Sequence, residues 1–295
     1  MNFKVKVYRV NKNKIKKIYI NDIDKNAVKS IKQNLTLNRI QYKNNKKISI
    51  TNLDANLFLL NSNGFDYIDL DPWGTPNPFL DAACKRIARD GILAVTTTDT
   101  AALCGTAFNA CVRKYWAIPK KGPIMHEIGL RILIRKIQLI AAQYDKALTP
   151  IFSYSKEHYM RVFFRNEKGK NKVDEILKQF NFFSNAGPLW AGKLYDENLC
   201  NKMYNNSLTK KIFNKNKELT KFLKTIKEES KINALGFYDL NDICEKNKIK
   251  NLQKKEAIIK KIIKLGYNAS GTHFAGYGVR SGIPYQKLVS LLKNK

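Results

Sequence analysis

Apolar and polar positions in the first part of the chain alternate between short apolar runs and amphipathic stretches. Three runs have the length and composition of strands: Lys14–Ile20, Ile48–Asp54 and Phe65–Asp71. Between the first two runs, residues 24–38 carry apolar side chains at helical spacing. Strands that alternate with a helix in this way predict an α/β sheet.

The same kind of pattern continues to about residue 165. It predicts a buried strand, a helix and an antiparallel pair of late strands: Gly91–Thr98, His126–Tyr144, Leu148–Tyr154 and Tyr159–Phe164. In the predicted helix, Glu127 and Arg131 stand four residues apart, so an internal ion pair is expected.

A polar stretch with Gly169 and several lysines, residues 166–172, predicts a boundary between a domain of residues 1–168 and a smaller one of residues 169–295. The second domain contains three predicted helices followed by a glycine-rich segment typical of a hairpin: Lys215–Glu229, Asp239–Lys246, Leu252–Leu265 and Gly266–Pro284. Helices followed by a hairpin predict an α+β module that is winged-helix-like.

The chain is strongly basic, with 54 Lys and Arg against 24 Asp and Glu, and a net charge of +30. Such an excess predicts a polyanionic partner, most simply nucleic acid. In the second domain, Tyr267, Phe274, Tyr277 and Arg280 are interleaved with lysines, which favours RNA. The alternative is a solvated lysine surface produced by a compositional bias towards Lys, Asn and Ile.

The five cysteines are scattered and never spaced as Cys-x-x-Cys, which argues against disulfides and structural zinc. The three histidines are far apart, so no metal site is predicted. The longest apolar stretch, Ile128–Ala142, contains Arg131, Arg135 and Lys136, so no membrane span is expected. No secretory signal is recognisable, and the cytoplasm is the expected location.

The segment Asp69–Pro76 reads Asp-Leu-Asp-Pro-Trp-Gly-Thr-Pro and follows a predicted strand. Ligands of open α/β sheets bind at the carboxyl ends of the strands. A carboxylate there can accept the proton that a base amine loses on methylation, and an aromatic ring beside a rigid proline can stack on an extruded base. The segment predicts Asp71 as the catalytic carboxylate, with Pro72 and Trp73 against the base. A strand-end acid that caps the next turn is the alternative.

Other polar residues also follow predicted strands. Asp22 can accept hydrogen bonds from the ribose of a nucleotide-like cofactor, or it can cap the following helix. Asp54 ends the next strand in the same way. Thr98 and Asp99 can read the edge of a base, or they can form a hydrogen-bonded turn.

Three strings resemble, in this order, the archaeal and eukaryotic tRNA guanine-26 N2-dimethyltransferase family: Asp69–Pro76, Thr96–Gly105 and His126–Leu133. Shorter matches extend over nearly the whole chain: Asn21–Ile23, Asp54–Asn56, Cys111–Tyr115, Gly187–Trp190 and Thr272–Phe274. One departure is Trp73, where relatives carry phenylalanine, and the indole keeps a stacking face. The cysteine-rich zinc insertion of some relatives has no counterpart between Arg165 and Gly187.

The resemblance implies a class I, Rossmann-like methyltransferase domain, S-adenosyl-L-methionine as cofactor and tRNA as partner. It implies contacts with the cofactor by Asp22, Ile23, Asp54, Ala55 and Asp69. It further implies that Asp71 is catalytic and that Pro72, Trp73, Thr98 and Asp99 meet a guanine.

No glycine precedes Gly64, so the glycine-rich turn that such a domain places after its first strand is missing. The methyltransferase domain is therefore expected to be incomplete at its N-terminal side: either the sequence is a downstream piece of a longer chain, or a separate upstream polypeptide completes the cofactor site. Two other functions stay open at this point: a non-catalytic tRNA-binding remnant, and an adenine N6-methyltransferase.

Overall fold

The computed structural model describes residues 15–210 and 216–293 of the 295-residue chain. They form a mixed α/β fold that divides into two compact units, Met1–Phe65 and Asp66–Lys295. The boundary expected at residue 168, between two functional domains, is a different division of the chain and stays a prediction.

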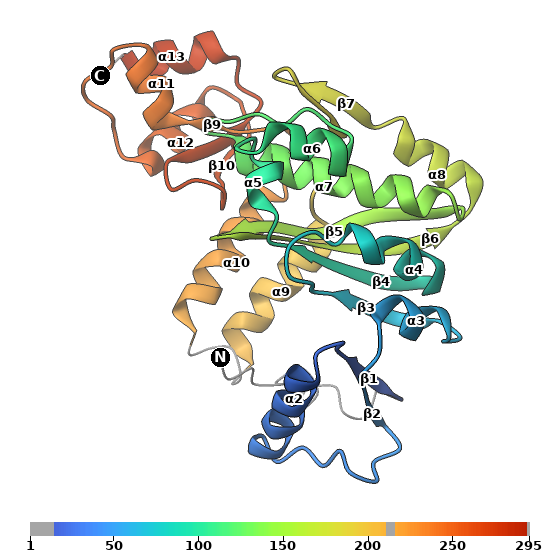
Figure 1. Ribbon diagram of the computed structural model, residues 1–295. Coiled ribbons are helices and arrows are strands. Elements are labelled where there is room, and N and C mark those ends of the chain that lie inside the picture. Colours follow the sequence, from blue (N-terminus) through green and yellow to red (C-terminus); the bar gives the residue numbers. More distant parts are fainter. Residues whose placement is uncertain (1–14, 211–215, 294–295) are drawn as a thin grey trace. The chain divides into compact units, whose positions relative to one another are not determined.

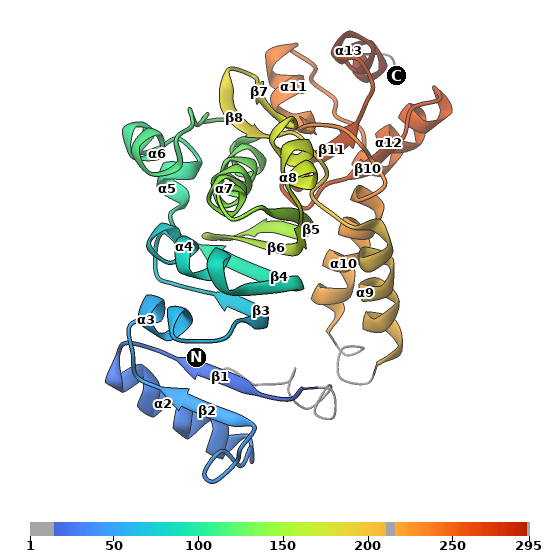
Figure 2. The same cartoon turned by 90° about the vertical axis from the view of Figure 1, so that its right-hand side faces the viewer.

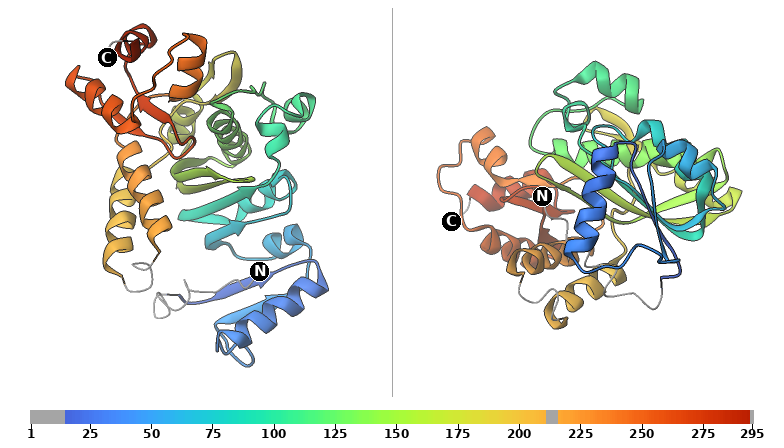
Figure 3. Two further views of the ribbon diagram at one scale, coloured as in Figure 1. Left: turned by 90° about the vertical axis from the view of Figure 1, so that its left-hand side faces the viewer. Right: turned by 60° about the horizontal axis from the view of Figure 1, so that its bottom comes forward.

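The first unit contains a two-stranded parallel sheet with a helix packed against it. Its elements are, in order, β1 (Ile18–Asn21), α2 (Lys25–Leu37), β2 (Ile48–Thr51) and α3 (Ala55–Leu60). Buried Leu35, Ile40 and Ile48 form its core, and Figure 3 shows α2 lying along the strand pair. The helix predicted over residues 24–38 is confirmed, and its N-cap is Asp24, which accepts a hydrogen bond from the Asn26 N–H.

The second unit is built on a four-stranded sheet with strand order β3-β4-β6-β5 (Figure 1). The elements of this part are β3 (Phe65–Leu70), α4 (Asn77–Arg86), β4 (Ile87–Thr97), α5 (Thr100–Leu103), α6 (Phe108–Tyr115), α7 (Met125–Ala142), β5 (Lys146–Lys156) and β6 (Tyr159–Lys168). Both β4 and β5 pair with β6 in antiparallel fashion, so the predicted late antiparallel pair is confirmed. Leu93 pairs with Phe164 and Val95 with Val162, and all four side chains are buried.

The connection at Gly169 is short, because β6 ends at Lys168 and α8 (Lys170–Leu177) begins directly after Gly169. Helix α8 packs back on β5 and β6. After α8 the chain forms a hairpin and two helices that pack together: β7 (Phe180–Phe183), β8 (Ala186–Trp190), α9 (Glu197–Thr209) and α10 (Lys217–Glu229). Residue 215, where the helix now called α10 was expected to begin, lies outside the described residues.

The C-terminal part has a hydrophobic core of its own and a three-stranded sheet of order β10-β11-β9 (Figure 2). Its elements are β9 (Tyr238–Asp239), α11 (Leu240–Lys246), α12 (Lys255–Lys264), β10 (Ala269–Gly271), β11 (Gly278–Ser281) and α13 (Tyr285–Lys293). The predicted helices followed by an antiparallel hairpin are therefore confirmed. No helix among the described residues combines the length and apolarity needed to cross a membrane.

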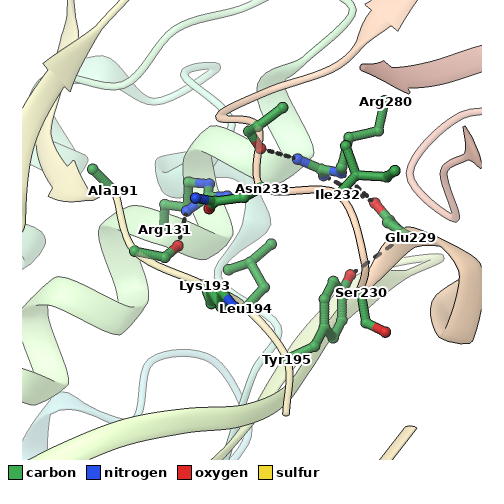
Figure 4. A pocket seen from close by; sticks show the side chains of 12 residues that line it. Arg131, Ala191, Lys193, Leu194, Tyr195, Glu229, Ser230, Ile232, Asn233 and Arg280 are labelled. Atoms are coloured by element: carbon green, nitrogen blue, oxygen red, sulfur yellow. Dashed lines mark hydrogen bonds and ion pairs between the residues drawn. The ribbon is translucent and has the colours of Figure 1, made fainter. Parts of the chain in front are cut away.

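A buried cluster of charged side chains joins α7 to the C-terminal part of the chain (Figure 4). The Arg280 guanidinium donates to Glu127 Oε2 at 2.6 Å and to Glu229 Oε1 at 2.9 Å, and all three side chains are at most 2% exposed. Arg131 donates to Glu127 Oε1 at 2.9 Å, which confirms the predicted ion pair. Arg280 was expected at an RNA-facing surface. That expectation is wrong, because its side chain is buried and paired with Glu127 and Glu229.

Glu229 has the more polar surroundings of the two acids. It accepts hydrogen bonds from Thr272 Oγ1 at 2.5 Å and from His273, whose Nδ1 lies at 2.8 Å, and the Tyr195 hydroxyl lies at 3.4 Å. Burial by itself raises the pKa of Glu229, but His273 and Arg280 outweigh burial and lower this pKa to about 2. The carboxylate therefore stays ionised and requires the guanidinium of Arg280 as its cationic partner.

Replacement of Arg280 by methionine should strongly destabilise the fold. The change leaves Glu127 and Glu229 buried without their shared cation, and breaking a buried ion pair by removing one partner costs about 3–5 kcal/mol. The measurement is urea unfolding followed by circular dichroism. Exposed Arg89 on β4 supplies the matched control, since Arg89→Met should change the free energy of unfolding by less than about 0.5 kcal/mol. Equal stabilities of the two variants would show that the cluster does not support the fold.

Candidate active site

The Asp71–Thr75 turn after β3 is fixed by the end of β4. The Gly74 N–H donates to Thr98 Oγ1 at 2.8 Å, and the Gly74 carbonyl accepts from the Thr98 N–H at 3.0 Å and from the Thr97 hydroxyl at 2.9 Å. Gly74 has a φ of 82°, which glycine adopts without strain. The backbone is thus anchored one residue after Trp73, whose side chain is 99% exposed.

Asp71 is exposed, and within residues 15–210 and 216–293 its carboxylate has no hydrogen-bond or ion-pair partner. It therefore does not cap the turn that follows, contrary to the alternative interpretation of the Asp-Pro sequence. A free carboxylate next to an exposed aromatic ring can accept a proton from a ligand that stacks on the ring.

Asp99 is held by the C-terminal end of α6. Its Oδ2 accepts from Lys114 Nζ at 3.0 Å and from the Tyr115 hydroxyl at 3.1 Å. The Tyr115 hydroxyl also lies 3.0 Å from Thr75 Oγ1, so it connects the acid to the turn that carries Trp73. Burial raises the pKa of Tyr115, so this hydroxyl stays protonated. Neither Lys114 nor Tyr115 was predicted as a site residue, and the family-like string Cys111–Tyr115 was the only signal.

Asp69 lies on β3, two residues before Asp71, and its carboxylate is bound by side chains of the sheet. Its Oδ2 accepts from Arg161 Nη2 at 2.6 Å and from the Tyr67 hydroxyl at 3.2 Å, and Arg161 also donates to Thr96 Oγ1 at 2.5 Å. Burial, assisted by the Asp69 charge, raises the pKa of Tyr67 to about 12. The expected cofactor contact of Asp69 stays a prediction.

In the first unit, the loops after β1 and β2 are tied together by two asparagines. Asn21 Oδ1 accepts from the Thr51 hydroxyl at 2.7 Å, and Asn21 Nδ2 donates to the Leu53 carbonyl at 2.9 Å. Asn52 Nδ2 donates to the carbonyls of Asp22 and Ile23 at 2.9 and 2.8 Å. These cross-links, which the sequence did not reveal, fix the backbone that carries the predicted cofactor residues.

The two predicted cofactor acids of this unit differ in their local roles. Asp54 is the N-cap of α3, and its Oδ1 accepts from the N–H groups of Asn56 and Leu57. Asp22 Oδ1 accepts from the Asp24 N–H at 2.9 Å, and Asp24 is the cap of α2. Among the described residues the Oδ2 atoms of both acids have no partner. Ile23 is 70% exposed, and Ala55 begins α3.

Within the described part of the chain, no three His, Cys, Asp or Glu side chains are placed to hold a metal ion. All five cysteines are buried and unpaired. Burial raises the pKa of Cys104 to about 11, so the thiol beside His126, with Sγ and Nδ1 3.5 Å apart, is not ionised at neutral pH.

Acids that follow strands, with a fixed turn that presents an indole to solvent, are typical of an α/β protein that binds a nucleotide or a base. The profile of the family described as N2,N2-dimethylguanosine tRNA methyltransferase matches residues 6–186 and 181–293. The chain belongs to this family.

Individual relatives agree with this assignment. The chain is 36% identical to a tRNA (guanine(26)-N(2)/guanine(27)-N(2))-dimethyltransferase of Aquifex aeolicus, over 95% of this chain and 76% of the relative. It is 34% identical to the tRNA (guanine(26)-N(2))-dimethyltransferase of Pyrococcus abyssi, over 94% and 80%. Among solved structures, Trm1 from Pyrococcus horikoshii in complex with S-adenosyl-L-methionine superposes with a TM-score of 0.84 at 34% identity, covering 94% of this chain and 82% of that one.

Replacement of Thr98 by valine should loosen the turn that presents Trp73. The change removes the acceptor of the Gly74 N–H, a loss of about 1 kcal/mol, so the Gly74 amide should exchange its hydrogen about fivefold faster. Hydrogen–deuterium exchange of the peptide around residue 74 measures this. Thr98→Ser keeps the hydroxyl and should exchange like the wild type; equal exchange in all three proteins would rule out the anchoring role.

Proposed function

We propose that the chain transfers methyl groups from S-adenosyl-L-methionine to the exocyclic N2 amine of guanine 26 in tRNA, giving N2-methyl- and N2,N2-dimethylguanosine. Membership of the family and the activities named for the relatives support this proposal. The observation that carries it is the unpartnered carboxylate of Asp71, two residues before the fully exposed ring of Trp73.

The exocyclic amine of guanine is a poor nucleophile because its lone pair is delocalised into the ring. Asp71 accepts a hydrogen bond from this amine, orients it, and takes the proton that the nitrogen loses as its bond to carbon forms. The bound cofactor supplies an electrophilic methyl group. Asp71 has no competing partner among the described residues, so the carboxylate needs no rearrangement before it binds the amine.

Trp73 and Pro72 hold the extruded base by stacking, a contact worth roughly 1–3 kcal/mol. Guanine presents N–H donors at N1 and N2, whereas adenine presents an acceptor at N1. Asp99 Oδ1 has no partner among the described residues and can accept the N1–H, while Thr98 can donate its hydroxyl hydrogen to a base oxygen. This donor and acceptor pattern favours guanine.

For the cofactor, we propose that Asp22 binds the ribose hydroxyls and that Asp54 and Ala55 meet the adenine, with Ile23 and Asp69 also in contact. The free Oδ2 atoms of Asp22 and Asp54 fit acceptors for ribose O–H and adenine N–H donors. The cross-links of Asn21 and Asn52 support this assignment because they hold the loops of both acids in one arrangement.

The methionine end of the cofactor needs a further segment. No residue before Gly64 is glycine, and positions 1–63 therefore offer no turn of the kind that approaches the cofactor closely. Among the described strands β1 pairs only with β2, so its other edge is unpaired. We propose that a separate upstream polypeptide supplies this turn.

We further propose that residues 1–168 act as the methyltransferase domain and residues 169–295 as a tRNA-binding domain. The separate hydrophobic core around Leu240, Ile258 and Leu288 supports a distinct module at the C-terminal end. Five unpaired buried thiols suit the reducing cytoplasm, which we take as the site of action. Family membership disfavours a non-catalytic remnant and an adenine N6-methyltransferase.

Replacement of Asp71 by asparagine should lower the rate of methyl transfer by about 10²–10⁴-fold, because the amide cannot take the proton of the amine. Transfer of labelled methyl to a tRNA transcript, followed by nucleoside analysis, measures the rate. The assay uses the chain completed with the upstream segment if the chain alone is inactive.

Asp66→Asn, an equivalent change of an exposed acid on the preceding strand β3, is the control and should leave the rate near that of the wild type. Full activity of the Asp71 variant, or methylation only at a base other than guanine, would contradict the proposed function.

S-adenosyl-L-methionine should bind this chain weakly or not at all by titration calorimetry, and should bind once an upstream polypeptide that carries a glycine-rich turn is added. The reason is the missing turn at the methionine end. Circular dichroism first establishes that the chain is folded. Tight binding to the chain alone would show that no upstream glycine turn is required.

A further inference from the structure

A groove of about 630 Å³ lies between α12 and α13 in the C-terminal part of the chain; Figure 2 shows α12 beside β10 and α13 near the C-terminus. Lys261 and Lys264 line it from α12, and Lys287 lines it from α13. Leu265 and Tyr267, which follow α12, also line the groove. The groove is far in sequence from every residue assigned to the candidate active site.

The charge of the groove is not compensated. None of its lining residues is acidic, and within residues 15–210 and 216–293 none of its three lysines has an ion-pair partner. On neighbouring α11, in contrast, Lys246 is paired with Asp242 at 2.7 Å. Three ammonium groups around one hollow, with no acidic partner among the described residues, are complementary in charge to a polyanion.

An aromatic and an apolar side chain, Tyr267 and Leu265, also form part of the groove wall. The Lys287 ammonium donates to the Tyr267 hydroxyl at 3.1 Å and lies 5.5 Å from the ring centroid, and Leu265 is 55% exposed. A sugar–phosphate backbone matches both components, because its phosphates pair with lysines while ribose and base pack on tyrosine and leucine.

We propose that this groove binds the sugar–phosphate backbone of the tRNA substrate and so holds the RNA while the turn at Trp73 takes up the base. The inference rests on the proposed function for the identity of the RNA and adds the surface that binds it. The groove replaces Arg280 as the basic element of the RNA-binding surface, since that arginine is buried in the charged cluster.

Binding of a tRNA transcript to the full chain, measured by fluorescence anisotropy between about 50 and 200 mM salt, tests the proposal. The triple variant Lys261→Gln, Lys264→Gln and Lys287→Gln should bind at least tenfold more weakly. Its plot of log affinity against log salt should be shallower by roughly 2–3 units, because each lysine that contacts a phosphate contributes about one unit.

The matched control is the triple variant Lys217→Gln, Lys221→Gln and Lys224→Gln, which removes the same charge from the exposed face of α10. It should bind with nearly wild-type affinity and slope. Equal losses in both triple variants, or no loss in the groove variant, would overturn the inference while leaving the proposed activity standing. Failure of the wild-type chain to bind tRNA would count instead against the proposed substrate.

Discussion

The second unit depends on the buried guanidinium of Arg280, which lies between two carboxylates that come from distant parts of the chain. Glu127 is in the first turn of α7 and Glu229 ends α10, so one side chain of β11 joins the sheet's covering helix to the C-terminal part. Three buried charges are costly to desolvate, and they are tolerated because nearly every donor and acceptor is used. Arg280 also donates to the carbonyls of Ala234 and Gly236, which fixes the loop before β9.

The candidate active site uses a different type of constraint. The turn after β3 is shaped by hydrogen bonds of the Gly74 main chain to the N–H and the side-chain hydroxyl of Thr98. Lys114 and Tyr115 occupy one oxygen of Asp99, whereas the Asp71 carboxylate has no partner among the described residues. The two acids beside this turn therefore differ in how far neighbouring side chains hold them.

Much of the fold could be predicted because its elements carry regular patterns. The stripe of α2, the apolar run of β3 and the paired late strands follow from periodicity, and the ion pair of Glu127 and Arg131 follows from a spacing of four. The fate of Arg280 could not be predicted, since a basic residue in a glycine-rich hairpin resembles a surface residue until the fold places Glu127, 153 positions earlier, beside it. Likewise, spacing gives no sign that Tyr115 reaches Thr75 across 40 positions.

Gly129 allows helices α7 and α5 to pack closely against each other. A Cβ atom at this position would come within 2.9 Å of the Leu103 carbonyl, so α7 and α5 touch backbone to backbone, and α5 begins directly after Asp99. The same helix α7 holds Arg280 through Glu127. Helix α7 therefore links β11, which carries Arg280, to the segment that follows Asp99. If the groove between α12 and α13 binds the RNA backbone as proposed, this spacing would select the nucleotide that reaches Trp73 by its distance from the groove, with little need to read neighbouring bases.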